Sequence, residues 1–232
     1  MMSDDILARV LYRDTSFIVL DKPAGLPVHP GPGGGVCIEH FFPLLTFGLP
    51  RPPALAHRLD RDTSGCLILG RHRKTLAKLG KLFQQGRIGK TYWAIVEGAP
   101  PGESGTIDAP LSKLTPKQGW KMVVDPKHGQ HAVSDWRVLG KGELPGVGPI
   151  AWLEFSPKTG RTHQIRVHAQ HLGCPVLGDP IYGLSPKPAL PLHLHARKVV
   201  IPFKSESPPV EVEAPPPDHM LAALKLCGYI IP

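Results

Sequence analysis

The chain has 232 residues, of which 41% are hydrophobic and 20% are charged, as in ordinary folded proteins. This length can bury a hydrophobic core in one large domain or two small subdomains. The 27 Lys and Arg residues exceed the 19 Asp and Glu residues, giving a net charge of +8. That excess fits a polyanionic partner such as nucleic acid, although a basic surface can also serve solubility alone.

The first ten residues, MMSDDILARV, are acidic where a signal peptide would be basic, and no long apolar run follows. We therefore expect a cytoplasmic protein without a membrane segment. The four cysteines are widely spaced with no Cys-x-x-Cys pair, which argues against a zinc ribbon. Cys66 lies in the apolar run CLIL and is expected to be a buried, reduced thiol.

Twenty-eight prolines and 25 glycines predict a loop-rich chain of short elements, closer to α+β than to a helical bundle. Residues 6–22 predict two short strands around a turn at residues 13–16. The glycine-rich segment 29–35 predicts a mobile surface loop, since it lacks the Gly-Lys-[Ser/Thr] ending of a phosphate-binding loop. Apolar residues at helical spacing predict a helix over residues 75–85 that ends before Gly86.

The second half of the chain predicts strands over residues 91–96, 133–139, 150–155 and 193–201, a turn-rich region at 100–118 and a loop at 184–191. Residues 141–149 predict a hairpin-like connection. Residues 162–172 predict a helix that buries Ile165, Ala169 and Leu172 and stops at Gly173. A last short helix is expected to be capped by Asp218 and to stop at Gly228.

The densest polar cluster, HRLDRDTSG, spans residues 57–65 and precedes the apolar run CLIL. Charged residues at the start of a strand stand where loops commonly present catalytic groups on a rigid sheet. Asp60 lies between Arg58 and Arg61, whose positive charges favour an ionised carboxylate. Such a group can act as a nucleophile or a base, but not as a general acid. A surface turn with an Arg–Asp network explains the same composition.

A second cluster, KTGRTHQIRVH, spans residues 158–168. On a helix, His163 and Arg166 would share a face, and the guanidinium groups of Arg161 and Arg166 suit phosphate or carboxylate partners. His163 and His168 are five residues apart, one more than the spacing that aligns two metal ligands, so we expect no metal site. A basic, solvated helix is the alternative.

A third segment, KTYWAIVEG at residues 90–98, alternates as a strand, with Tyr92, Ala94 and Val96 on one face. A strand tyrosine usually serves packing, but it can also stack on a base that has left its helix.

Together these segments resemble the RluA family of pseudouridine synthases. The likeness rests on strings that stand in the family's order over residues 10–200: DKPAGL at 21–26, HRLDRDTSG at 57–65 and GRTHQIRVHAQHLGCPVLGDPIYG at 160–183. The resemblance implies a pseudouridine synthase fold: an α+β domain with a mixed, largely antiparallel sheet, split into two subdomains around a central RNA-binding cleft. It implies one catalytic domain over residues 1–232, without the small RNA-binding module that precedes the first motif in many relatives.

Residue by residue, the resemblance implies that Asp60 is the catalytic aspartate, that Tyr92 stacks on the target base and that Arg166 is the basic partner of the aspartate. Arg58 matches the arginine that flips and holds the nucleotide. We also expect RNA contacts from the basic or imidazole side chains of both clusters: His57, Arg61, Arg161 and His163.

The implied activity is the cofactor-free isomerisation of uridine to pseudouridine in ribosomal or transfer RNA, by a monomer. Asp60 would attack the anomeric carbon or abstract a ribose proton; the sequence leaves both routes open. A noncatalytic RNA-binding protein is the rival reading, and the presence of all four matched residues argues against it. A glycoside hydrolase would need a second carboxylate across a sugar, and Asp62 is too close in sequence. The motifs do not point to a base-excising glycosylase.

Overall fold

The computed structural model describes residues 3–31, 34–114, 121–185, 189–204 and 206–231. The chain divides into two compact units. Unit 1 comprises Met1–Lys90 and Ala196–Pro215, and unit 2 comprises Thr91–His195 and Pro216–Pro232. Both combine helices with paired, mainly antiparallel strands, which confirms the predicted α+β class with a mixed, largely antiparallel sheet.

The sheet of unit 1 contains four neighbouring strands and two shorter ones. The main strands are β1 (Val10–Arg13), β2 (Phe17–Lys22) and β4 (Ser64–Gly70), followed in order by β11 (Leu194–Ile201). The shorter strands β3 (Ala54–Leu55) and β12 (Val210–Glu213) pair with β4 and β11. A side-chain oxygen of Asp14 accepts the amides of Ser16 and Phe17, which closes the predicted turn between β1 and β2.

Unit 1 is held together by a core beneath α2 (Arg73–Gln84). Leu79 and Leu82 of this helix pack with alternate residues of β2 and β4: Phe17, Val19, Cys66 and Ile68. On the same unit, α1 (Ser3–Leu7) contacts the 3₁₀ helix η1 (Ile38–Leu45). The burial of whole apolar runs in β2 and β4 explains why neither strand shows strict alternation in the sequence.

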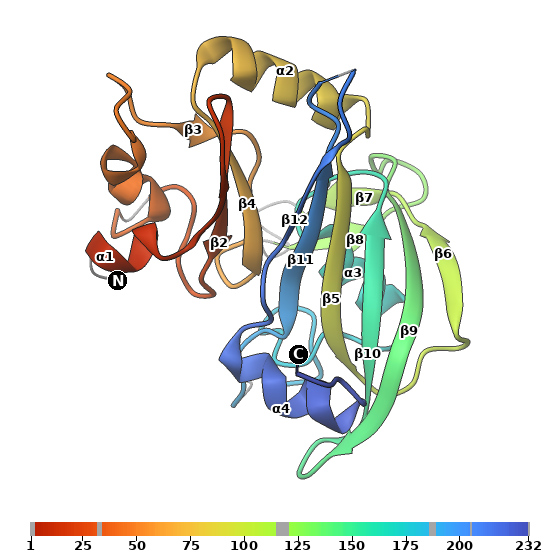
Figure 1. Ribbon diagram of the computed structural model, residues 1–232. Coiled ribbons are helices and arrows are strands. Elements are labelled where there is room, and N and C mark those ends of the chain that lie inside the picture. Colours follow the sequence, from red (N-terminus) through yellow and green to blue (C-terminus); the bar gives the residue numbers. More distant parts are fainter. Residues whose placement is uncertain (1–2, 32–33, 115–120, 186–188, 205, 232) are drawn as a thin grey trace. The chain divides into compact units, whose positions relative to one another are not determined.

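The sheet of unit 2 has four antiparallel strands, seen side by side in Figure 1. Their order is β5 (Gly89–Glu97), β10 (Gly148–Pro157), β9 (Val133–Leu144) and β6 (Ser104–Asp108). A separate pair is formed by β7 (Leu111–Lys113) and β8 (Met122–Val124).

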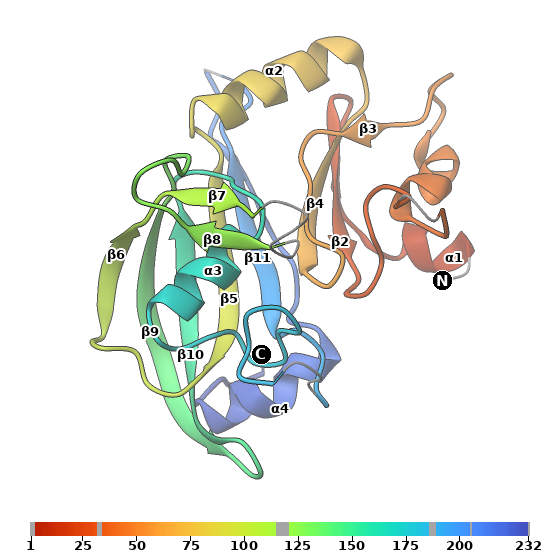
Figure 2. The ribbon, with the colours of Figure 1, turned by 180° about the vertical axis from the view of Figure 1, so that it is seen from behind.

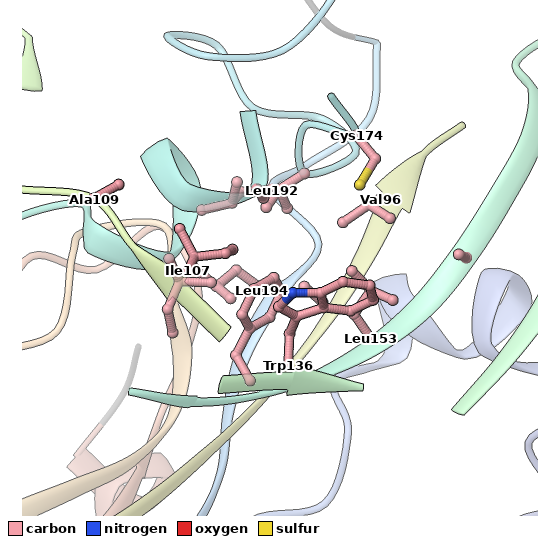
Figure 3. Packing of buried hydrophobic residues seen from close by; sticks show 14 residues of the cluster. Val96, Ile107, Ala109, Trp136, Leu153, Cys174, Leu192 and Leu194 are labelled. Atoms are coloured by element: carbon pink, nitrogen blue, oxygen red, sulfur yellow. The ribbon is translucent and has the colours of Figure 1, made fainter. Parts of the chain in front are cut away.

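The two faces of this sheet are covered by different helices. Side chains of α3 (Gln164–His171), including Ile165 and Ala169, pack on the face that carries Ala94 and Val96. Figure 2 shows α3 over that face together with β7 and β8, and Figure 3 shows the packed side chains. On the other face, α4 (Asp218–Leu226) packs Met220 and Leu224 against Trp93, Ile95 and Trp152. The period-2 alternation predicted for residues 91–96 is confirmed.

Several element boundaries differ from the prediction. Residues 6 and 7 belong to α1 and not to a strand. Asp218 is the first residue of α4 and not its cap, since Pro217 is the N-cap. The expected connection at residues 141–149 is largely strand, since β9 and β10 extend to a tight turn.

Of the loops predicted at 29–35 and 184–191, residues 32–33 and 186–188 lie outside the described residues. All four cysteines are buried and free, as predicted for Cys66.

Candidate active site

The loop that carries Asp60 joins β3 to β4, directly before the buried strand, as the sequence predicts. The amide of Thr63 donates to the carbonyl of Asp60 at 3.2 Å, so residues 60–63 form a tight turn. Arg58 and Arg61 are exposed, and the Arg61 Nε donates to the carbonyl of Gly25 at 3.2 Å. The Asp60 loop is thereby joined to the loop that follows β2.

Lys22, at the end of β2, lies beneath this junction and is fully buried. Its Nζ donates to three backbone carbonyls, those of Pro23, Leu26 and Arg61, each at 2.8 Å. Burial lowers the pKa of Lys22 to about 7, against the opposing influence of the Asp62, Asp60 and Asp21 carboxylates. The three bonds use every hydrogen of an ammonium group and fix the two loops to each other.

His57, a predicted RNA contact, has an internal role in the structure. Its Nε2 accepts the amide of Ile68 at 3.0 Å, and its ring packs 4.9 Å from that of Phe83. Burial, with a smaller effect of the Lys90 charge, lowers the pKa of His57 to about 4. The ring is therefore neutral at pH 7 and anchors the start of the Asp60 loop to β4, while an RNA contact through it stays a prediction.

The partly buried His57 and the buried His193 predict that the protein loses stability in acid. Burial also lowers the pKa of His193, in unit 2, to about 4. Between pH 6.5 and pH 4 the unfolded chain binds more protons at these rings, so the free energy of unfolding falls as the pH falls. At pH 5 we expect a loss on the order of 1–2 kcal/mol per ring. Thermal melts at pH 7.5 and pH 5 test this.

The control for this pH effect is a histidine that is exposed. Compared with wild type, His193→Gln should narrow the difference between the two melting temperatures, whereas His171→Gln should not. An equal difference in all three proteins would show that the buried ring does not cause the acid sensitivity.

Tyr92 lies in β5 opposite Phe155 of β10 and is partly buried against the α3 face of the unit 2 sheet. The strand and the face are those predicted. Its stacking role stays a prediction.

Arg166 differs most from its predicted surroundings, because α3 buries residues all around its first turns. Arg166 is buried, with only 3% of the residue exposed. Its Nε and one terminal nitrogen donate to the two carboxylate oxygens of Asp179 at 2.7 and 2.8 Å. The burial of Arg166 and of its neighbours in α3 also excludes the alternative of a basic, solvated helix. The predicted pairing of Arg166 with Asp60 stays a prediction.

Asp179 belongs to the LGDPIYG string and was not assigned a role from the sequence. It also accepts the amides of Ile181 and Tyr182 at 2.9 and 3.0 Å. Burial alone would raise the pKa of Asp179. The hydrogen bonds and charge of Arg166, together with the hydrogen bonds from the two amides, hold this pKa below its ordinary value. Tyr182 places its ring 5.1 Å from the Arg166 guanidinium. The string therefore builds the surroundings of Arg166.

A glycine is required next to this pair. Gly178 has a φ of +75°, and a Cβ there would overlap the carbonyl oxygen of Pro191. The backbone can place Asp179 against Arg166 only because this position has no side chain.

His163 does not share a helix face with Arg166, because the helix starts one residue later than His163. His163 has a left-handed backbone with φ of 53° and precedes the first turn of α3 as its N-cap. Its Nδ1 lies 2.9 Å from the Tyr182 hydroxyl. Arg161 is exposed and donates to the His131 carbonyl and the Gln130 side chain, both at 3.0 Å. Its predicted RNA contact is compatible with this exposure and remains untested.

Among the described residues, no group of three or more His, Cys, Asp or Glu side chains is arranged to hold a metal ion. None of the helices in the same part of the chain is long and apolar enough to span a membrane.

Comparisons with known proteins agree with the family that these motifs indicate. The sequence profile described as RNA pseudouridylate synthase matches residues 16–171, a range that includes Asp60, Tyr92 and Arg166. An uncharacterised RNA pseudouridine synthase of Zymomonas mobilis is 45% identical over 214 residues, which is 90% of this chain and 94% of that protein. Ribosomal large subunit pseudouridine synthase C of Buchnera aphidicola is 38% identical over 181 residues, covering 78% of this chain and 56% of that protein.

A solved structure agrees with the sequence matches. Human RNA pseudouridylate synthase domain containing 4 aligns with a TM-score of 0.77 and 29% identity, covering 96% of this chain and 95% of that chain. The predicted fold is confirmed by this similarity.

Proposed function

We propose, because the chain belongs to the RNA pseudouridylate synthase family, that Asp60 is the carboxylate with which it isomerises uridine to pseudouridine in RNA. The observation that supports this role is the fixed position of the loop that carries Asp60. The buried Lys22 and the internal His57 fix the loop on either side of it. Catalysis on a sugar carbon requires such a fixed carboxylate, since misplacement by 1 Å can cost two orders of magnitude in rate.

The reaction sets simple chemical demands. The bond from the ribose anomeric carbon to N1 of uracil breaks, the base rotates, and the same carbon bonds to C5, whose proton leaves as N1 gains one. No atoms are lost and no electrons are transferred to another molecule. The uridine must leave its stack before a side chain can reach it. Asp60 would either attack the anomeric carbon or abstract a ribose proton.

We assign the remaining roles by the same matches. Tyr92 would support the extruded base by stacking, Arg166 would fix the charge and rotamer of the aspartate, and the exposed Arg58 would hold the displaced nucleotide. Arg61 and Arg161, both exposed, would contact RNA phosphates. We propose that the enzyme acts as a monomer in the cytoplasm.

The substrate is proposed to be structured RNA, either ribosomal or transfer. One relative is named for the large ribosomal subunit, which supports ribosomal RNA as the first to test. Mapping pseudouridine in total RNA from cells with and without the gene identifies the position. A site that disappears with the gene and returns with its expression names the substrate; an unchanged map would contradict the proposed activity in those cells.

The isomerisation is expected to survive complete removal of divalent metal. The chemistry has no redox step, and Asp60 would provide the reactive group. Tritium release from RNA labelled at C5 of uridine, measured before and after EDTA treatment, should stay within about twofold on a short substrate that folds without magnesium. Loss of release that zinc restores would contradict a metal-free mechanism.

A further inference from the structure

The exposed side of α2 carries a concentration of positive charge that the proposed catalytic residues do not use. Between Arg71 and Arg87 the sequence contains no Asp or Glu, and its Lys and Arg residues are Arg71, Arg73, Lys74, Lys78, Lys81 and Arg87. All except Arg71 are exposed. Arg71 instead donates to the carbonyls of Asp14, Thr46 and Phe47 inside unit 1.

Three of these cations form a stripe along the helix. Lys74, Lys78 and Lys81 follow the i, i+4, i+7 spacing and so lie on one face. The buried face of the same helix packs on the unit 1 core through Leu79 and Leu82. The stripe is therefore presented by a helix whose position is fixed by packing.

This arrangement costs helix stability. Arg73 and Lys74 occupy the first turn, where the positive end of the helix dipole disfavours cations, and Lys74 and Lys78 repel each other at i, i+4. Each effect is worth a few tenths of a kcal/mol. A solvated helix selected for stability would carry carboxylates at these positions.

The cations of α2 also lack the partners that cations elsewhere have. In unit 2, Arg137 pairs with Glu154, and Lys141 pairs with Glu103. Within the described parts of the chain, none of the four exposed cations on α2 lies within ion-pair distance of a carboxylate. Lys78 instead stands 4.5 Å above the ring of Phe203, next to the exposed Lys204. Figure 1 shows this β11–β12 connection beside α2.

We propose that this basic face, made of Arg73, Lys74, Lys78, Lys81 and Lys204, binds the phosphate backbone of the substrate RNA outside the modified nucleotide. The inference rests on the proposed function in that it takes RNA as the partner. A row of unpaired cations on a rigid helix neutralises successive phosphates and releases their counterions, which favours binding without reading sequence. The face gives the enzyme affinity for RNA structure around its target.

The test neutralises the stripe without changing helix propensity. The triple variant Lys74→Gln, Lys78→Gln, Lys81→Gln is compared with a control of equal charge change, Arg137→Gln, Lys141→Gln, Lys225→Gln, whose cations are exposed on unit 2. The slope of log affinity for RNA against log salt should become shallower by about 2 in the stripe variant, since each lost contact removes about 0.7–0.9. The control should keep most of the wild-type slope.

Kinetics separate this inference from the proposed activity. The stripe variant should raise KM at least tenfold while kcat at saturating RNA stays within about twofold. An equal loss of slope in both variants, or none in the stripe variant, would overturn the proposal. If the stripe variant showed the same loss of slope with polyglutamate in place of RNA, the face would be assigned to an acidic protein partner instead. Wild-type protein that binds RNA through α2 but releases no tritium would contradict the activity and not the binding face.

Discussion

Asp60→Asn is expected to abolish isomerisation while RNA affinity and fold remain close to those of wild type. The amide has almost the same shape as the carboxylate, so the turn closed by Thr63 and the Arg61 carbonyl bond to Lys22 are retained. It can neither attack a sugar carbon nor accept a ribose proton, so both routes fail. Tritium release should fall by at least about 10³-fold, or about 4 kcal/mol in the barrier.

The neighbouring Asp62→Asn is the matched control. Both carboxylates act on the pKa of the buried Lys22, and both lie in the same loop. If the loss in Asp60→Asn came from disturbing Lys22, Asp62→Asn would show a comparable loss. We expect it to keep activity within about tenfold. Tritium release by Asp60→Asn within tenfold of wild type would remove Asp60 from its proposed role.

Elements held by local packing could be predicted from the sequence, and elements held by distant pairing could not. The helix α2 and the strand β5 show their apolar faces within a single window of sequence, and both were located within two residues. The strands β6, β7, β8 and β12 are only three to five residues long and exist because other strands pair with them. Their formation depends on partners that a local window does not contain.

The candidate site shows the same division. The motif strings predicted the position of Asp60 at the head of a buried strand, because that depends on neighbouring residues. They did not predict that Lys22 reaches the Arg61 carbonyl, 39 residues away, or that Asp179 pairs with Arg166. Lys22 lies in the string DKPAGL and Asp179 in the string LGDPIYG, so the sequence did contain a signal for these two buried charges. A charged residue next to proline and glycine in an otherwise apolar string is a candidate for burial with a partner.

The pair of Arg166 and Asp179 should behave as one unit in both stability and activity. Both side chains are at most 4% exposed, so removing one leaves a buried charge without its partner. Arg166→Ala is expected to cost about 3–5 kcal/mol of unfolding free energy and most of the activity. Arg166→Lys should keep most of the stability and part of the rate, because an ammonium cannot reproduce the bidentate bond. Denaturant titration and tritium release measure the two effects.

A double-mutant cycle separates the pairing from the rest of the site. Arg166→Met and Asp179→Leu should each destabilise unit 2, and the double variant should be less destabilised than the sum, since no charge is then buried alone. If Arg166 also acts on Asp60, the double variant should remain inactive. The exposed Arg161→Ala is the control: it should leave stability within about 0.5 kcal/mol and raise KM for RNA. Additive losses in the cycle would show that the two side chains do not depend on each other. Full activity in the double variant would show that catalysis does not need a guanidinium at position 166.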